Sequence, residues 1–229
     1  IAAAVARGPG FDPARLDEAK KRFGCAVYED HRDLLRREKL DFVVVVTRSD
    51  QHCAMACDVM EAGVNVLVTK PWAVDGAEAR RLVETAKRTK RILLPWMPVH
   101  WAGDTKHIRD LLMRKAIGDP FLVRRTVTCF ARRNDWQTER RYGGGYLLNW
   151  GAHIVYPALL VAGGQPKSVY AKLQQVINPG DTEDQFFAAF TMDNGGLVTA
   201  EHSITPASQP NWLVQGTKGS IVAHGASVR

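Results

Sequence analysis

The stretch that decides the fold is residues 42–71, FVVVVTRSDQHCAMACDVMEAGVNVLVTKP. It begins with an apolar run at residues 42–46 and ends with a second, largely apolar run at residues 64–68. Continuous β-branched runs of this length are typical of parallel strands that are covered on both faces. Between them we predict a helix that Ser49 or Asp50 caps and that Gly63 ends. A strand, a helix and a strand in this order predict a parallel sheet with crossover helices.

The flanking segments extend this pattern over the first half of the chain. Asp12-Pro13 predicts the start of a helix that Gly24 closes, and Asp75 predicts the cap of another helix that runs to about Thr89. The remaining predicted elements of this half are strands at residues 1–6 and 91–94 and a short helix at residues 31–38. We therefore predict an incomplete Rossmann-type α/β domain over residues 1–97, truncated at its N-terminus.

The pattern changes after Pro95-Trp96-Met97-Pro98, where predicted strands begin to dominate. Asp193-Asn194-Gly195-Gly196 is a strong hairpin signal between two of them. The predicted helices cover residues 102–116 and 146–161, and the predicted strands cover residues 121–130, 168–176, 185–192, 197–204, 212–215 and 220–223. This order predicts an α+β domain with a mostly antiparallel open sheet over residues 98–229, truncated at its C-terminus.

Composition narrows the class of protein. The chain carries 31 Lys and Arg residues against 24 Asp and Glu residues, a formal net charge of +7, but no short block is rich in Lys or Arg. This favours solvated helix faces and a site for an anionic ligand over nucleic-acid binding. No apolar run approaches the ~20 residues of a membrane span. The four cysteines lack metal-type spacing, so we expect reduced thiols in a cytoplasmic protein.

Polar residues follow two of the predicted parallel strands. Thr47-Arg48-Ser49-Asp50 follows the first strand and Thr69-Lys70-Pro71 follows the second. Ligands of open α/β sheets bind beyond the carboxyl ends of the strands, so these segments are candidates for a binding site. A Lys held there can stabilise negative charge that develops on a substrate oxygen. The alternative is a solvated surface lysine.

Gly143-Gly144-Gly145 precedes an apolar helix that carries Asn149 and His153 on one face, because these two residues are four apart. A site role and a core histidine satisfied by hydrogen bonds are both open for His153. The preceding loop, Arg132-Arg133-Asn134-Asp135-Trp136 with Arg140-Arg141, either reaches a ligand or is a solvated basic loop. The histidines at positions 100, 107, 202 and 224 show no ligand spacing, so we assign no metal.

Six short motifs follow one another along the chain. They are Thr47-Arg48-Ser49-Asp50-Gln51-His52, AGVNVLV at residues 62–68, Thr69-Lys70-Pro71, Gly118-Asp119-Pro120, GGGYLLNWGAH at residues 143–153, and Gly216-Thr217-Lys218-Gly219-Ser220. In order and spacing, this series resembles the Gfo/Idh/MocA family of NAD(P)-dependent sugar and polyol oxidoreductases.

The resemblance implies a Rossmann domain that binds NAD or NADP, and a second domain whose open sheet forms a homo-oligomer. It implies that Lys70 orients a sugar or polyol and that His153 transfers a proton as hydride moves between the substrate and the nicotinamide. Imidazole suits that role at neutral pH. The implied cofactor-binding residues are Thr47, Arg48, Ser49, His52, Thr69 and Lys70, and the substrate-binding candidates are Trp136, Tyr146, Asn149 and His153.

The departures from the family pattern matter as well. Residues 1–6 match the family's second strand, so we expect a glycine-rich loop upstream and an inactive fragment. Arg7 follows Ala6, where an acid is expected; Arg7 either accepts the 2′-phosphate of NADP or is an exposed loop residue. Asn149 replaces an aspartate, and an amide cannot exchange a proton, which leaves His153, Lys70 or a tyrosine (Tyr142 or Tyr146) for that step. In addition, Arg48 replaces a proline and Thr69 a glutamate.

Three functions remain open at this point. The first is an NAD(P)-dependent dehydrogenase or reductase acting on a sugar, a polyol or a related small molecule. The second is a glycoside hydrolase on the same scaffold, in which a tightly held NAD oxidises and re-reduces the substrate. The third is a non-catalytic descendant that binds a nucleotide or a sugar, which Asn149 and Thr69 favour.

Overall fold

The computed structural model describes residues 2–4, 14–204, 209–225 and 227–228. The chain divides into two compact units, Ile1–Trp96 and Met97–Arg229, one residue from the division expected after residue 97. The predicted helix start at Asp12-Pro13 lies outside the described residues.

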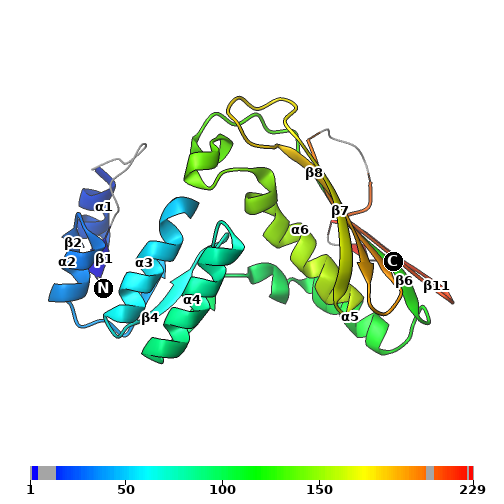
Figure 1. The fold of residues 1–229 in the computed structure, drawn as a ribbon, viewed down its shortest axis with the longest axis horizontal. Coiled ribbons are helices and arrows are strands. Elements are labelled where there is room, and N and C mark those ends of the chain that lie inside the picture. Colours follow the sequence, from blue (N-terminus) through cyan, green and yellow to red (C-terminus); the bar gives the residue numbers. More distant parts are fainter. Residues whose placement is uncertain (1, 5–13, 205–208, 226, 229) are drawn as a thin grey trace. The chain divides into compact units, whose positions relative to one another are not determined.

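The first unit alternates strands and helices, as predicted (Figure 1). Its elements are β1 (Ala2–Ala4), α1 (Ala14–Phe23), β2 (Ala26–Tyr28), α2 (His31–Arg37), β3 (Phe42–Val45), α3 (Ser49–Glu61), β4 (Asn65–Val68), α4 (Gly76–Thr89) and β5 (Leu93–Pro95). Strands β3, β4 and β5 form a parallel sheet, and β1 pairs with β2 in a separate parallel sheet. Strand β2 was not predicted, because three residues are too few to show a period.

Helices α3 and α4 lie side by side and bury the core of the three-stranded sheet (Figure 1). The Asp75 side chain accepts a hydrogen bond from Glu78 N, which confirms the predicted cap of α4. For α3 the prediction of Ser49 or Asp50 as cap was wrong, since Arg48 holds that position without a side-chain cap bond. The prediction that residues 42–46 are covered on both faces was also wrong. Val44 is 53% exposed and Val46 is 69% exposed, because β3 is an edge strand whose helices cover only the face of Val43 and Val45.

The second unit is an antiparallel-rich sheet with two main helices. Its elements are the 3-10 turns η1 (Pro98–Trp101), η2 (Trp136–Thr138) and η3 (Arg140–Tyr142), the helices α5 (Gly103–Met113) and α6 (Tyr146–Ala162), and the strands β6 (Pro120–Thr128), β7 (Pro166–Gln174), β8 (Gln185–Met192), β9 (Leu197–Ser203), β10 (Trp212–Gly216), β11 (Gly219–His224) and β12 (Ser227–Val228). The sheet order is β12-β11-β10-β6-β9-β8-β7, and only the β6–β9 pair is parallel. The predicted fold class is confirmed.

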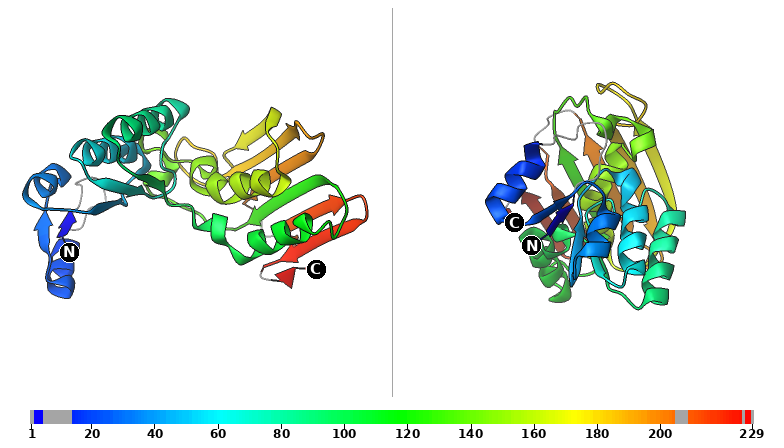
Figure 2. Two further views of the ribbon diagram at one scale, coloured as in Figure 1. Left: turned by 90° about the horizontal axis from the view of Figure 1, so that it is seen from below. Right: turned by 90° about the vertical axis from the view of Figure 1, so that its left-hand side faces the viewer.

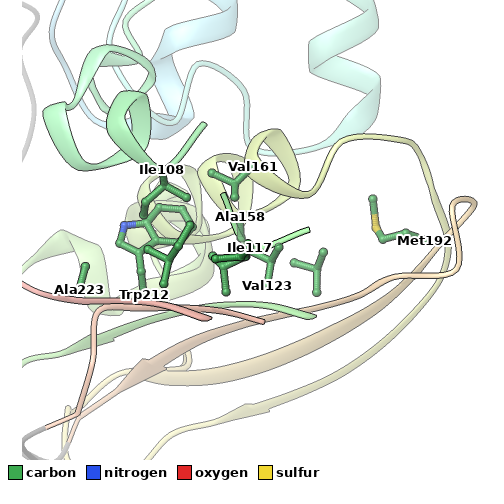
Figure 3. Packing of buried hydrophobic residues seen from close by; sticks show 11 residues of the cluster. Ile108, Ile117, Val123, Ala158, Val161, Met192, Trp212 and Ala223 are labelled. Carbon is green, nitrogen blue, oxygen red and sulfur yellow. The ribbon is translucent and has the colours of Figure 1, made fainter. Parts of the chain in front are cut away.

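Helices α5 and α6 pack on one face of this sheet (Figure 2). The fully buried Trp212 of β10 lies beneath Ile108 of α5, and Ala158 and Val161 of α6 complete the same cluster (Figure 3). Trp212 Nε1 donates to Asp104 Oδ2 at 2.9 Å, so the indole is satisfied within the core. This packing fixes α6, the helix that carries Asn149 and His153.

Candidate active site

The carboxyl edge of the parallel sheet in the first unit holds two of the predicted segments. Thr47 follows β3, and Thr69-Lys70 follows β4. The backbone N and the Oγ1 of Thr69 both donate to the Val45 carbonyl at 3.1 Å. Thr69 therefore fastens the ends of the two strands together and fixes the backbone that leads into the half-buried Lys70.

His52 lies below this edge rather than on its surface. The side chain is 1% exposed; its Nδ1 lies 2.6 Å from the Pro71 carbonyl oxygen and its Nε2 lies 3.0 Å from the Thr47 carbonyl oxygen. Its buried ring, engaged by backbone on both sides, argues against the hypothesis that His52 lines a cofactor. Ser49 is also buried. The His52 ring therefore joins the loop of Thr47 to the loop of Pro71.

Arg48 forms a two-pronged ion pair. Its Nε and Nη2 donate to the two carboxylate oxygens of Asp50 at 3.1 and 3.0 Å. This pair links the residue at the N-terminus of α3 to the first helical turn, and bidentate geometry makes it directional. Arg7, the candidate for a 2′-phosphate contact, lies outside the described residues.

In the second unit, the three glycines form a closely packed corner at the start of α6. A side chain at Gly144 would meet the carbonyl oxygens of Gln137 and Glu139 at 2.6 and 2.7 Å. Gly145 has a φ of +109°, and a side chain there would meet the Glu183 carboxylate at 2.6 Å. The same carboxylate accepts a hydrogen bond from Leu147 N at 2.9 Å. The glycines are therefore needed to bring η2 and Glu183 against the helix N-terminus, where a carboxylate is stabilising.

Asn149 and His153 lie half-buried on α6, on the face that the spacing predicts. Asn149 Nδ2 donates to Gln137 Oε1 at 2.7 Å, so η2 orients the amide. The His153 ring meets the Trp150 ring edge-on, with 6.2 Å between centroids. An oriented amide and an accessible imidazole on one helix face can hydrogen-bond a hydroxylated ligand.

Tyr146 belongs to the core, which argues against the hypothesis that it binds substrate. It is 2% exposed, and its hydroxyl donates to the Ala131 carbonyl at 3.2 Å. Its ring packs edge-on against His202 of β9 at 4.8 Å between centroids. The fully buried His202 also contacts Trp150 and Phe186, and desolvation lowers its pKa to about 4, against the weaker opposing effect of Asp184.

Acidic side chains of the protein already contact three of the arginines in the basic loop before α6. Arg133 pairs with Asp135 at 2.7 Å and Arg141 pairs with Glu139 at 2.6 Å. Arg140 N donates to Asp181 Oδ1 at 2.7 Å. These contacts favour the solvated-loop alternative over an anion site. Trp136 is half-buried at the start of η2.

Comparison with known families decides the class of protein. The family described as "Oxidoreductase family, NAD-binding Rossmann fold" matches residues 10–95, and the "GFO/IDH/MocA C-terminal domain" matches residues 105–222. The chain belongs to the GFO/IDH/MocA oxidoreductase family. The resemblance found in the sequence is thereby confirmed.

Individual GFO/IDH/MocA relatives match this chain over most of its length. The uncharacterized oxidoreductase YdgJ of Escherichia coli is 25% identical over 96% of this chain and 66% of its own length. The scyllo-inositol 2-dehydrogenase (NADP(+)) IolW of Bacillus subtilis is 24% identical over 93% of this chain and 60% of its own. The crystal structure of an NAD-binding protein from Listeria innocua has 27% identity and a TM-score of 0.88, covering 94% of this chain and 63% of its own. The chain thus spans less than two thirds of the length of these relatives.

The GFO/IDH/MocA family implies NAD or NADP as cofactor. The hydroxyls of Thr47 and Thr69 and the ammonium group of Lys70 follow the carboxyl ends of β3 and β4, where doubly wound sheets bind nucleotides. Such donors and acceptors fit the hydroxyls and amide of a nicotinamide riboside. The described residues do not include a glycine-rich loop for the pyrophosphate. They contain no cluster of side chains fit for a metal ion, nor a helix long and apolar enough to span a membrane.

Three residues that shape the GFO/IDH/MocA α6 site were not found by sequence reasoning. Gln137 and Glu183 reach the start of α6 from η2 and from the loop before β8, and His100 of η1 meets Tyr156 on α6. The motif patterns contain no signal for these contacts, because each joins α6 to a segment at least 12 residues away.

Proposed function

We propose that the complete protein transfers a hydride between NAD(P) and the hydroxyl or carbonyl carbon of a sugar, a polyol or a related small molecule. One observation carries this proposal: on a GFO/IDH/MocA scaffold, α6 presents an oriented Asn149 and a half-buried His153 on one face. Lys70 at the end of β4 adds a cation at the edge where such sheets bind nucleotides. The polyol named in the description of IolW supports the substrate class.

Each residue then has a definite task. Lys70 hydrogen-bonds the reacting oxygen and stabilises negative charge that develops on it. His153 accepts the proton of the substrate hydroxyl during oxidation and returns it during reduction, since imidazole titrates near neutral pH. The Asn149 amide cannot exchange protons and instead holds a neighbouring hydroxyl, in the orientation that Gln137 sets. When bound, NAD(P) supplies the hydride acceptor or donor.

Two further assignments extend this proposal to cofactor choice and domain roles. Residues 1–97 form the dinucleotide-binding domain and residues 98–229 the substrate and oligomerisation domain. Arg7 makes NADP the better cofactor if its guanidinium meets the 2′-phosphate. Trp136 is half-buried at the start of η2, and we propose that its indole stacks on a sugar face.

A substrate panel tests the proposal in the full-length protein. Inositols, hexoses and aryl glycosides are each incubated with NAD+ or NADP+, and both reduced cofactor and released aryl alcohol are measured. We expect net NAD(P)H formation with at least one polyol or sugar. Aryl alcohol release without net NAD(P)H would instead indicate the glycoside hydrolase. Tight binding of a sugar or nucleotide without either reaction would indicate the non-catalytic descendant, which Asn149 favours.

We also propose that the protein forms a homo-oligomer through the outer face of its seven-stranded sheet. One row across the sheet faces the helices; in it Ala188, Ala200, Trp212 and Ala223 are buried and Arg125 is half-buried. The adjacent row faces the other way and contains no buried residue; it consists of Tyr170, Ala189, Thr199, Arg124, Leu213 and Val222. Tyr170 is 64% exposed. A wide face with an exposed aromatic group and half-buried aliphatic groups suits a second copy of the same chain.

Light scattering of the full-length protein tests this assembly. We expect a dimer or a larger oligomer in the wild type and a monomer after Ala189→Arg, which places a charge on the outer face beside Tyr170 of the edge strand β7. Lys87→Glu on the exposed side of α4 is the matched control and should not dissociate the oligomer. A monomeric wild type would contradict the proposal.

We further propose a cytoplasmic location. The cysteines at positions 25, 53, 57 and 129 are free thiols, and the first three are buried. Reduced thiols of this kind are typical of cytosolic proteins. Fractionation of the native host would show the protein with cytosolic markers, and its recovery in a secreted or envelope fraction would contradict the assignment.

A further inference from the structure

The row of hydrogen-bonding groups on α6 continues one turn beyond His153. Asn149, His153 and Tyr156 occupy positions i, i+4 and i+7 of one continuous helix. At 3.6 residues a turn, these positions fall within an arc of about 60° and span about 10 Å along the helix axis. All three side chains are half-buried, so they are held by their surroundings and still reach solvent.

Tyr156 is oriented by a partner outside its own helix. Its hydroxyl lies 2.5 Å from Nδ1 of His100 in η1, and the two rings stack with 5.9 Å between centroids. Asn149 is oriented in the same manner by Gln137 of η2. Both ends of the row are thus aligned by side chains from 3-10 turns. The core contacts of α6 lie on the opposite face of the helix, where Ile154 and Ala158 are buried.

We propose that Tyr156, oriented by His100, is a specificity-determining residue that binds a substrate hydroxyl. The substrate class is a polyhydroxylated ring, such as an inositol or a pyranose, with one hydroxyl for each group of the row. This proposal rests on the proposed function and deepens it. A row of about 10 Å is longer than a single alcohol needs, and it suits a ring that carries hydroxyls on several carbons.

The hydrogen-bonding capacity of the His100–Tyr156 pair explains why it would distinguish a ring with the matching hydroxyl from a ring without it. With a proton on Nδ1, His100 donates to the phenol oxygen, and the phenol hydrogen is directed to a substrate oxygen. In the other tautomer Tyr156 donates to Nδ1, and its oxygen accepts from a substrate hydroxyl. In both states a ring that lacks this hydroxyl leaves a half-buried polar group without its ligand partner, and sites built to bind a hydroxyl reject such analogues strongly.

The kinetic test compares the best polyol of the panel with its monodeoxy analogues in the full-length enzyme. We expect Tyr156→Phe to lower kcat/KM for the polyol about tenfold, mainly through KM, while one deoxy analogue keeps its kcat/KM within about twofold. His100→Gln should give a smaller loss on the same analogue pair. The matched control is Tyr28→Phe, which also removes a hydroxyl bonded to a side chain, that of Glu38 in the first unit. Tyr28→Phe should leave kcat/KM unchanged for both the polyol and its deoxy analogues.

A binding test needs no turnover. In nitrogen-labelled full-length protein, addition of the same polyol should shift the His100 ring resonances in the wild type and in Tyr28→Phe, but not in Tyr156→Phe. Equal losses on the polyol and all deoxy analogues, or unmoved His100 resonances, would show that the pair only ties η1 to α6 and would overturn the proposal. A wild type that binds the polyol with shifted resonances but transfers no hydride would overturn the proposed function alone.

Discussion

The strand-end loops of the first unit and helix α6 of the second use their motif residues in opposite ways. At the strand ends, Thr69 Oγ1 donates to the Val45 carbonyl, and the His52 ring lies between the carbonyls of Pro71 and Thr47, so these motif residues hold backbone segments together. On α6 the motif residues Asn149 and His153 are half-buried side chains on one face. Residues outside the motif, among them Glu183 and Gln137, hold that helix in place.

One motif can therefore contain both residues that face a ligand and residues that only hold the backbone in place. A histidine stands in both regions, yet His52 is buried between two carbonyls while His153 reaches the surface. Substitutions in α6 should therefore change the chemical step. Substitutions among the scaffold residues of the strand ends should change cofactor affinity, with little effect on the chemical step.

The largest effect is expected for His153→Asn. Loss of a positioned general base typically lowers the rate 10²–10⁴-fold, so kcat should fall by about that factor while KM changes less than about threefold. Steady-state kinetics of the full-length protein measure this. His224→Asn, on the exposed end of β11, is the matched control and should keep wild-type kcat. A kcat within a few-fold of wild type would assign His153 to the scaffold.

Lys70→Met should be the next most severe change. It keeps an apolar stem of similar length and removes the ammonium group, and loss of one such electrostatic group costs about 10²–10³ in rate. The Lys87→Met control lies on the exposed face of α4. If kcat/KM stays near the wild-type value, Lys70 is a surface lysine and the first unit contributes only binding.

The buried His202 predicts acid sensitivity of the second unit. Its folded pKa of about 4 is below the unfolded value of about 6.5, so the unfolded state binds the proton first as the pH falls. His202 therefore leaves the free energy of unfolding unchanged above pH ~6.5. Between pH ~6.5 and ~4 it lowers that free energy by up to about 3 kcal/mol. Urea unfolding at pH 7.5 and 5 measures this loss. His202→Phe should flatten the dependence, and an unchanged slope in that variant would refute the assignment.

His52→Gln should have the smallest of these effects and should appear in binding. A neutral imidazole carries one N–H, so His52 donates to either the Pro71 or the Thr47 carbonyl, and loss of that bond is equivalent to about 1 kcal/mol. We expect the Kd for NAD(P) to rise about five- to tenfold, with kcat within about threefold of wild type. Fluorescence titration measures the affinity. A collapse of kcat comparable with that of Lys70→Met would show that His52 touches the reacting groups.

Much of the fold follows from local pattern. The β-branched runs, the Asp75 cap and the Asp193-Asn194-Gly195-Gly196 hairpin predict α4, β3, β4 and the β8–β9 turn correctly, because these signals depend on neighbours in the chain. Strand β2 and the exposed face of β3 were not predicted. Strand β2 is too short to show a periodic pattern, and the exposure of β3 depends on which helices cover the sheet. A short stretch of sequence indicates neither.

The site is less visible in the sequence. The positions of Asn149 and His153 on one helix face follow from spacing, but spacing did not show that Tyr146 would turn into the core towards His202. The His100–Tyr156 contact joins residues 56 positions apart and leaves no local pattern. Burial and contacts with residues distant in the sequence decide whether a polar side chain is available to a ligand. Both are set only when the chain folds.

The most direct test of the central claim follows the hydride itself. The full-length protein is incubated with NAD(P)+ and an inositol or pyranose that carries deuterium on its ring carbons, and the reduced cofactor is examined by mass spectrometry and NMR. We expect one deuterium on the nicotinamide ring of each NAD(P)H formed, at a rate that His153→Asn reduces. Reduced cofactor without deuterium, or none at all with any ring polyol of the panel, would contradict it.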